Sequence, residues 1–576
     1  MPQFLDRWSR RVEKTWFFPS AVAVMCFLVI IVPLSIGGLH ASGDLTVYLS
    51  FAQEFRSSLL EGDLFPAWTF DNVGYGGVGL RFYPPMAGLT TALIASLTGS
   101  WFYAIWIYFI LWLAVGCTGV YLFVRDWSTP QQGLLAGILY AIAPFPVAEI
   151  YQFSLYAEFA AGAIVPYCFL YITRSIRYQR WSDAIGLTLS LSVLILTHIP
   201  TTIITGFSLF LYALFIIERR AIGNTILKVC TAGSLGLLLT AFYWLPVITE
   251  LEWLKHNQEK YSTAMAGYQQ WIFPHILRAG EAPGYLVPVY RNMDAIIILT
   301  VAFLIPYFLI LVIDRRGLKE RYGRLCASVA LVGLFGFFMS SSASAWIWSQ
   351  FALLQKIQFP WRWMTLTSVL AVASFAFSLP LLLKTYSAVR TFALMGVIGM
   401  IALVIVYDVR QSFARLNTIS RTEFEDMLRE SINPSGTSYE AWWPIWAKSD
   451  ALKTTDKVTA GARAVEIKTW HRDRRTFAIA PGLGETARIA TFFYPHWRAR
   501  VNGAAAEITH DENGAIVIPL SAEYSSIELY FQEPMMNIIA SWVSLGTLII
   551  LATALLIFGW RNIGRRSLWF TSIIGS

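Results

Sequence analysis

The stretch WFYAIWIYFILWLAVGCTGVYLFV, residues 101–124, has no charged side chain and is long enough to cross a bilayer. Apolar runs of this kind recur along the chain. Of its 576 residues, 56% are hydrophobic and only 14% are charged. A soluble protein carries roughly 25% charged residues. We therefore predict a mainly α, polytopic membrane protein.

Twelve spans fit the apolar runs. We predict them at roughly 17–38, 101–124, 131–147, 157–173, 183–199, 201–217, 225–245, 294–313, 325–342, 364–383, 391–408 and 536–559. With this count, the Lys and Arg clusters of the loops all lie on one side, which the positive-inside rule assigns to the cytoplasm. Both termini then lie there as well, and we expect a cell inner membrane. The net charge of +8 thus sets orientation, and no nucleic-acid partner is expected.

A shorter apolar stretch, residues 84–98, begins at Pro84-Pro85 and has no charged loop after it. A span here would invert every later loop, so we expect an interfacial helix on the outer surface. The first apolar run lacks a small-residue cleavage site, which predicts a retained anchor. The five cysteines lie in or beside apolar segments, so neither a disulfide framework nor a cysteine metal site is expected.

Three regions remain outside, at about 39–100, 246–293 and 409–535. The third is polar and contains strand patterns, namely ARIATFFYPHWRARVNG (487–503), HDENGAIVIPL (510–520) and SSIELYF (525–531). Within it, Asn513-Gly514 is a strong hairpin signal. We predict a transmembrane domain over 1–408, a small extracytoplasmic antiparallel β-sandwich within 409–535, and a final span with a cytoplasmic tail over 536–576.

The first outer loop contains the first candidate catalytic residue. Asp44 directly follows the first span, where a carboxylate is costly unless it is paired or functional. It is either a catalytic base or the N-cap of the helix LTVYLSFAQEF. Further along this helix and just after it, Glu54, Glu61 and Asp63 are expected on a solvated face.

Two more carboxylates are candidate catalytic residues. Asp71 opens the Gly-rich turn DNVGYGG, whose glycines permit close approach of a ligand, although a plain loop explains it equally well. Nearby Tyr75 and Arg81 are candidate substrate-binding residues. Glu158, in YAEF, leads directly into a span, and an ionisable residue at this depth is a functional candidate. The alternative for Glu158 is a structural pairing with Arg or His from another helix.

Four further candidates for substrate binding come from the middle of the chain. His198 ends a span in LTHIPTT and suits phosphate binding or proton transfer, or else a structural role. Trp244 and Glu250 lie at the outer end of the next span but one, where the Trp also suits an interface anchor. Arg278 belongs to the locally basic loop that follows.

The segment KIQFPWRWM, residues 356–364, places Arg362 between Trp361 and Trp363 at the outer membrane edge. An arginine here suits a phosphate headgroup, because its planar fork pairs with two phosphate oxygens. The two tryptophans would hold a lipid chain or a sugar face. Interfacial snorkelling is the alternative. We favour the phosphate site, because Pro360 fixes the approach of the chain.

The order of these motifs resembles that of membrane glycosyltransferases of the GT-C superfamily: D-x-x-x-Y after the first span, a Gly-Tyr-Gly loop, FYPP and an interfacial helix. More narrowly, GYGGVGLRFYPP, APF…YAEFAAGAIVPY, LTHIPTT, FYWLPVITE and QFPWRW together resemble a bacterial group labelled 6-pyruvoyl-tetrahydropterin-synthase-related membrane proteins. The sequence has no soluble pterin-synthase fold and no matching His triad. FFYPHWRARVNG, IVIPL and IELYF resemble the outer domain of YfhO-type proteins, with His496 in place of the usual Gly and Asn502-Gly503 in place of Asp-Gly.

The resemblance implies a GT-C-like fold and a polyprenyl-phosphate-linked sugar donor that enters from the membrane. It further implies that Asp44 activates a hydroxyl of a glycan or lipid acceptor, and that transfer occurs outside the cytoplasm with inversion. Members often carry a paired acidic motif in the first loop. This chain has a single Asp with His40 upstream, which leaves a divalent cation an open question and keeps Asp71 and Glu158 as alternative bases.

Two other classes of function fit the same spans. One is a transporter or flippase for lipid-linked glycans, although the polar residues cluster on one face rather than at mid-membrane. The other is a non-catalytic subunit of an envelope polysaccharide machine. The sequence has no P-loop, GxSxG, HExxH or CxxC motif, so ATP-driven transport and zinc hydrolysis have no support.

Overall fold

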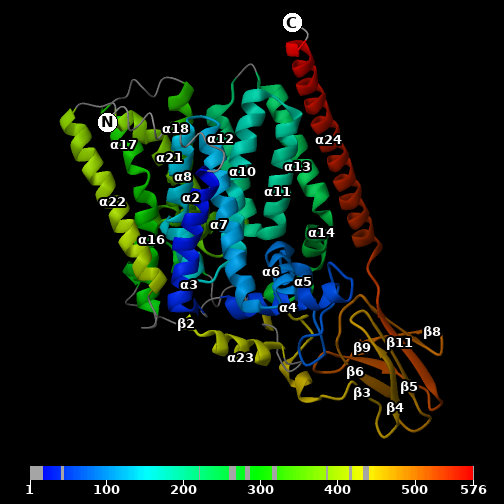
Figure 1. Cartoon of the computed structure of the whole chain (residues 1–576). Coiled ribbons are helices and arrows are strands. Elements are labelled where there is room, and N and C mark those ends of the chain that lie inside the picture. Colours follow the sequence, from blue (N-terminus) through cyan, green and yellow to red (C-terminus); the bar gives the residue numbers. More distant parts are fainter. Residues whose placement is uncertain are drawn as a thin grey trace.

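The computed structural model describes residues 17–40, 44–218, 221–257, 267–278, 286–313, 321–383, 387–413, 418–432 and 440–574. Its long helices form a bundle, and a β-sandwich lies at one end of this bundle (Figure 1). The helices of the bundle are α2 (Phe17–Cys26), α3 (Val32–Gly37), α7 (Trp101–Arg125), α8 (Pro130–Ala141), α9 (Pro144–Tyr151), α10 (Tyr156–Tyr178), α11 (Trp181–Thr197), α12 (Ile199–Ile216), α13 (Ile222–Leu239), α14 (Ala241–Glu250), α16 (Leu286–Ala302), α17 (Ile305–Ile313), α18 (Arg321–Ser340), α21 (Trp363–Leu383), α22 (Ser387–Phe413) and α24 (Met535–Ile574).

Each of the twelve predicted spans falls on one of these helices or on consecutive ones. Within the described residues, ten segments are long and apolar enough to cross a membrane, and the pair α16–α17, bent by 44°, makes an eleventh. Helix α11 is shorter, but it packs against α10, α12 and α13 and runs beside them (Figure 1). Counting α11 as a span would give the predicted twelve, but by length and composition the described residues contain ten or eleven candidate spans.

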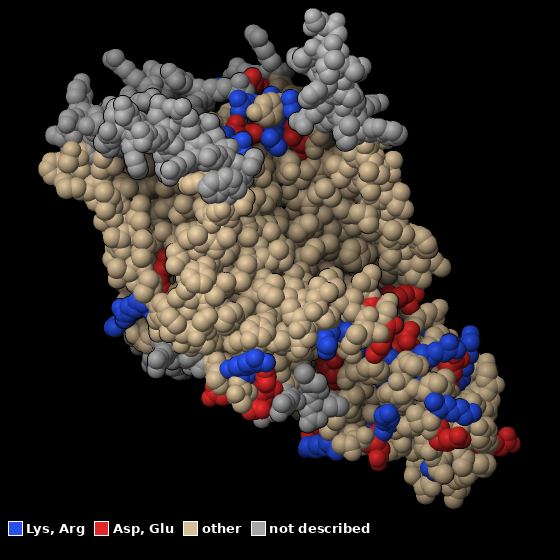
Figure 2. All heavy atoms as spheres, viewed as in Figure 1, with Lys and Arg blue, Asp and Glu red and all other residues tan. Residues whose placement is uncertain are grey.

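Caps and prolines set the helix boundaries. The Ser100 side chain accepts a hydrogen bond from Tyr103 N at the start of α7, and Thr129 caps α8 ahead of Pro130 in the same way. These caps satisfy amide groups that have no partner inside the helix. The side chains between them are almost all apolar, and Figure 2 shows a broad belt with very few charged side chains between the two charged ends of the molecule.

Smaller helices gather at the end of the bundle that faces the β-sandwich (Figure 1). They are α4 (Leu45–Leu60), α5 (Gly79–Phe82), α6 (Pro85–Thr98), α19 (Ala345–Gln350), α20 (Ala352–Gln355) and α23 (Arg421–Ile432), with short 3₁₀ turns such as η4 (Lys255–Asn257), η6 (His275–Arg278) and η9 (Pro360–Arg362). Helix α6 matches the predicted interfacial helix in bounds. It begins with a proline in its first turn and ends at Gly99, whose φ of 67° is left-handed.

The β-sandwich consists of two antiparallel sheets, with strand orders β3-β6-β10-β9 and β4-β5-β11-β7-β8. The strands are β3 (Val458–Thr459), β4 (Val465–Trp470), β5 (Arg474–Ile479), β6 (Thr486–Phe492), β7 (Trp497–Val501), β8 (Ala504–Ala506), β9 (Thr509–His510), β10 (Ala515–Pro519) and β11 (Ser525–Phe531). The three predicted strand segments are confirmed. The Asn513-Gly514 hairpin is also present, with Gly514 at φ 83° and Asp511 accepting bonds from the amides of Asn513 and Ala515.

The sandwich is fastened to the membrane helices by side chains. Arg472, in the turn between β4 and β5, donates to Glu54 (2.6 Å), Glu61 (3.0 Å) and Ser57 (2.5 Å). The prediction of a solvated face was wrong for Glu54, whose side chain is only 18% exposed because Arg472, remote in the chain, covers it. Glu61, at 46%, and Asp63 are exposed as predicted. A second tie is a short ribbon in which β1 (Leu39–His40) pairs with β2 (Thr418–Ile419).

Candidate active site

A buried carboxylate–arginine pair lies at the end of the bundle nearest the sandwich. Glu158, in the first turn of α10, is 2% exposed. Its Oε1 accepts a hydrogen bond from Thr365 Oγ1 of α21 at 2.9 Å, and its Oε2 lies 3.4 Å from Arg362 Nε. The predicted pairing of Glu158 with an arginine from another helix is thus observed, and the residue predicted to bind phosphate is its partner.

Arg362 is held in place without being saturated. Its Nη1 donates to the carbonyl of Ile357 at 2.7 Å, and its guanidinium lies 5.0 Å from the centre of the Phe359 ring. Its Nε has no hydrogen-bond partner among the described residues, since the 3.4 Å contact with Glu158 is longer than an ordinary N–H···O bond. The pair therefore keeps hydrogen-bonding capacity on both sides, which is uncommon for buried charges.

Asp44 lies near the same arginine. It is the residue before α4, but its side chain makes no capping hydrogen bond, so the N-cap alternative is not observed. The carboxylate is accessible to solvent although protein surrounds it. This burial raises the pKa of Asp44 above its ordinary 3.8, and the positive charge of Arg362 partly offsets the rise. Asp44 thus combines solvent exposure with a raised pKa, which suits a base.

Two more side chains complete this cluster. His198 lies between α11 and α12, where its Nδ1 shares a 2.7 Å hydrogen bond with Thr201 Oγ1, and it interacts electrostatically with Arg362. Tyr83, from the predicted FYPP motif, interacts electrostatically with Asp44, Arg362 and Glu158. The structure thus brings together three of the candidates, Asp44, Glu158 and His198, around Arg362.

The side chains that cover Tyr83 were not predicted from the sequence. Trp442, from the segment leading into the sandwich, packs edge-on against Tyr83 (5.8 Å) and stacks with His256 (4.7 Å, 27°). Burial lowers the pKa of His256, and the charges of Lys356 and Arg362 lower it further, so the imidazole is neutral at neutral pH. In the sequence, only the aromatic character of Trp442 within EAWW indicates that it packs against another part of the protein.

The two tryptophans beside Arg362 are buried among other aromatic rings. Trp361, 6% exposed, stacks with Phe359 and Phe153, and Trp363, 1% exposed, packs against Phe207 and Phe335. Their rings therefore contact protein. This packing fixes the backbone that carries the guanidinium.

Arg81 and Glu250 form a different cluster, which we call the joint. Arg81 donates to Glu250 at 2.9 and 3.0 Å and to Glu533 at 2.5 and 2.7 Å. Glu250 also accepts from Tyr494 OH at 2.8 Å and from Asn537 Nδ2 at 2.7 Å, and His496 Nε2 lies 3.2 Å away. The joint links the first loop, α14, the sandwich and α24.

The ionisation of Glu250 reflects this saturation. Burial alone would raise its pKa. The nearby His496, the charge of Arg81 and the hydrogen bonds from Arg81 and Asn537 outweigh burial and lower the pKa of Glu250 to about 2. Glu250 is therefore ionised at all physiological pH values, and its oxygens are occupied by protein donors.

The remaining predicted site residues lie elsewhere. Asp71 accepts a hydrogen bond from Thr69 within its own turn, and Tyr75 OH donates to Thr454 O at 3.1 Å and accepts from Arg488 at 2.8 Å. Both belong to a loop packed against the sandwich. Trp244 Nε1 donates to Leu237 O at 2.8 Å. The side chain of Arg278 lies outside the described residues, within which no group of three or more His, Cys, Asp or Glu side chains is placed to bind a metal ion.

The fold and the site define a polytopic helical membrane protein that carries a buried, unsaturated carboxylate–arginine pair where its bundle meets a β-sandwich. A family model described as "6-pyruvoyl-tetrahydropterin synthase related domain; membrane protein" matches residues 80–416, more than half of the chain. The chain belongs to this family, as the sequence motifs predicted. No curated protein matches it.

Several solved structures have a related arrangement. ArnT from Cupriavidus metallidurans bound to undecaprenyl phosphate is 13% identical over 64% of this chain and 78% of that one, with a TM-score of 0.34. Arabinofuranosyltransferase AftD from Mycobacteria is 14% identical over 73% of this chain and 28% of that one, with a TM-score of 0.43. The Archaeoglobus fulgidus oligosaccharyltransferase tethered with an acceptor peptide is 13% identical over 75% of this chain and 61% of that one, with a TM-score of 0.41. TM-scores this low do not assign an activity to this chain.

Proposed function

We propose that this protein is a membrane glycosyltransferase that transfers a sugar from a polyprenyl-phosphate donor to a glycan or lipid acceptor on the side of the sandwich. The observation that carries the proposal is the unsaturated Arg362–Glu158 pair beside the accessible carboxylate of Asp44. A guanidinium at the membrane boundary, a carboxylate that holds it and a second carboxylate open to solvent are the groups that this reaction needs.

Each of the three residues has a role in the proposed reaction. Arg362 binds the phosphate of the donor and stabilises the negative charge that grows on it as the glycosidic bond breaks. Glu158 positions Arg362 through the 3.4 Å contact and is itself oriented by Thr365. Asp44 accepts the proton of the acceptor hydroxyl, and its raised pKa makes it a stronger base than an ordinary aspartate.

The chemistry of sugar transfer also explains why carboxylates lie beside Arg362. A glycosyl transition state has oxocarbenium character, which nearby carboxylates stabilise. Asp44 suits the base better than Asp71, since Asp71 is engaged in its own turn, and better than Glu158, which faces Arg362. In this proposal His198, which interacts electrostatically with Arg362, contributes to binding the donor.

The test is sugar transfer by the purified chain in nanodiscs, with a panel of radiolabelled polyprenyl-phosphate sugars and an envelope lipid extract as acceptor. We expect wild type to transfer and Asp44→Asn to lose roughly 10²–10⁴-fold in rate. Asp63→Asn is the matched control, because Asp63 is an exposed aspartate of the same loop. Equal rates for wild type and Asp44→Asn would remove Asp44 as the base. No transfer from any donor, with the protein folded, would favour a transporter or flippase of lipid-linked glycans or an assembly subunit.

A further inference from the structure

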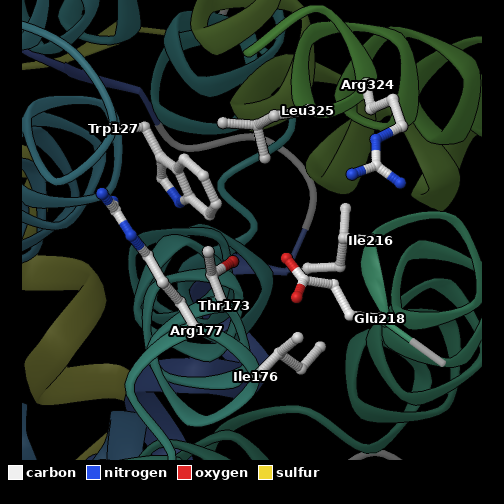
Figure 3. A pocket seen from close by; sticks show the side chains of 8 residues that line it. All are labelled: Trp127, Thr173, Ile176, Arg177, Ile216, Glu218, Arg324 and Leu325. Atoms are coloured by element: carbon white, nitrogen blue, oxygen red, sulfur yellow. The ribbon is translucent and has the colours of Figure 1, made fainter. Parts of the chain in front are cut away.

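The two ends of α10 differ in what they offer a ligand. At the end away from the sandwich, Thr173, Ile176 and Arg177 help to line a hollow with room for about one water molecule, which is too little for a sugar or a lipid (Figure 3). At the sandwich end, Arg362 keeps an Nε without a hydrogen-bond partner in the described residues. The groups that fix this guanidinium therefore decide how a ligand meets it.

Aromatic rings connect Arg362 to the segment that precedes α16. The guanidinium carbon lies 5.0 Å from the centre of the Phe359 ring. Trp271, the last residue of the 3₁₀ turn η5 (Tyr268–Trp271), packs edge-on against the same ring at 5.6 Å and 83°. Phe359 also stacks with Trp361 at 5.1 Å. Because Phe359 is held between two rings, the position of Trp271 limits where Phe359 and the guanidinium beside it can lie.

Trp271 is itself held by a buried histidine. His275 Nε2 lies 3.0 Å from the carbonyl oxygen of Trp271, and since a carbonyl only accepts, Nε2 donates. His275 Nδ1 lies 2.6 Å from Asp294 Oδ1 of α16. The amides of His275 and Ile276 donate to the same carboxylate at 2.8 and 2.9 Å. Asp294 thus fixes the turn η6 on α16, and His275 fixes Trp271 on that turn.

A second connection joins this segment to the backbone that carries Arg362. The amide of Phe273 donates to Ser340 O at 2.9 Å, and its carbonyl accepts from Ser342 N at 2.8 Å. Ser340 Oγ in turn donates to the carbonyl of Pro360 at 3.1 Å, in the turn η9 that ends at Arg362. The segment before α16 therefore supports Arg362 both through the ring of Phe359 and through the backbone of η9.

We propose that Trp271 and His275, held by Asp294, are positioning residues that set the Arg362 guanidinium for the phosphate of the donor. This inference rests on the proposed transferase function and deepens it. The positioning residues act through Phe359 rather than on the reacting atoms. A guanidinium binds two phosphate oxygens at once only when its plane is correctly oriented. Loosening Phe359 should therefore weaken donor binding and leave the acceptor step at Asp44 unchanged.

The experiment measures two properties of the purified full chain in nanodiscs, namely the Kd for undecaprenyl phosphate and the separate KM values for donor and acceptor. Trp271→Leu should raise the Kd and the donor KM roughly tenfold, the loss expected for one charge-assisted hydrogen bond. The acceptor KM should stay unchanged. Phe359→Leu removes the ring next to the guanidinium and should have the same effect. Trp346→Leu is the matched control, because Trp346 is an exposed tryptophan of α19 at the same end of the bundle.

Two substitutions of His275 distinguish positioning from a general loss of packing. His275→Gln keeps an N–H where Nε2 donates to Trp271 O, and it should retain most of the donor affinity. His275→Asn keeps an N–H where Nδ1 meets Asp294 but loses the bond to Trp271, and it should behave like Trp271→Leu. Equal donor KM values for the two variants, or a larger loss in His275→Gln, would overturn the positioning role.

The binding measurement also separates this inference from the function on which it rests. No binding of undecaprenyl phosphate by wild type, or equal binding by wild type and Arg362→Gln, would contradict the proposed function and the inference with it. Loss of binding in Arg362→Gln together with unchanged binding in Trp271→Leu and Phe359→Leu would overturn the positioning role alone.

Discussion

Two of the buried acid–arginine clusters in the described residues differ in how completely their carboxylates are satisfied. In the joint, Glu250 receives bonds from Arg81, Tyr494 and Asn537 at 2.7–3.0 Å. In the candidate active site, Glu158 receives one bond, and its arginine stands 3.4 Å away with an unpartnered Nε. The Glu250 carboxylate is fully engaged by protein donors, so we assign it a structural role, whereas Glu158 and Arg362 keep hydrogen-bonding capacity for a ligand.

The largest expected effect is on catalysis at the unsaturated pair. Glu158→Gln should lower transfer by roughly 10²–10³-fold, because the neutral amide no longer orients the guanidinium that meets the phosphate. The thermal midpoint, followed by tryptophan fluorescence, should change little, since Gln keeps the bond from Thr365. A large loss of stability with normal activity of the folded fraction would reverse the comparison.

The joint should respond in the opposite way. Glu250→Gln leaves Arg81 partly uncompensated and should cost about 3–5 kcal/mol of stability, while folded protein keeps its transfer rate. The pKa of Glu250 falls from 4.5 to about 2 on folding, so its contribution is complete above pH 4.5 and is lost as pH falls toward 2. Unfolding measured between pH 6 and 2 should show this loss in wild type and not in Glu250→Gln.

The pH dependence of transfer sharpens the role of Asp44. A base works in its ionised form, so kcat/KM should fall as pH drops through the pKa of Asp44. Because burial raises that pKa, the fall should occur above pH 3.8. An acid limb at or below 3.8 would mean that Asp44 titrates as an ordinary exposed aspartate and is not the base.

The smallest effect is expected at Trp442, which packs against Tyr83 and His256 beside the candidate active site. Trp442→Ala removes the ring that contacts Tyr83 and His256 and should raise KM a few-fold with little change in kcat, because no reacting group is removed. Trp446→Ala, in the same segment but packed on Phe493, is the control. Identical behaviour of the two variants would make Trp442 a purely structural residue.

Hydropathy and charge located every helix of the bundle because spanning a bilayer demands long apolar runs and basic residues on one side. The same logic found Asp44, Glu158 and Arg362, since ionisable groups at the membrane edge stand out from apolar neighbours. The sequence could not show that Glu158 keeps a free acceptor while Glu250 is fully hydrogen-bonded. Both look alike in sequence, and their difference lies in partners such as Tyr494 and Asn537 that are remote in the chain.

The contacts that the sandwich and the segment leading into it make with the membrane helices could not be predicted from the sequence either. Arg472 covers Glu54 and bonds to Glu61, and Trp442 covers Tyr83, through contacts that depend on how the sandwich docks. Short-range patterns such as Asn-Gly turns specify the strands of a sandwich, but they carry no information on where it rests.

The joint also has a consequence for the order in which its contacts form during synthesis. Arg81 and Glu250 can pair as soon as the first loop and α14 exist. Glu533, the second acceptor of Arg81, comes 452 residues after it in the chain. The first loop and α14 can therefore meet early, but the sandwich and α24 are fastened to them only when Glu533 and Asn537 have been made.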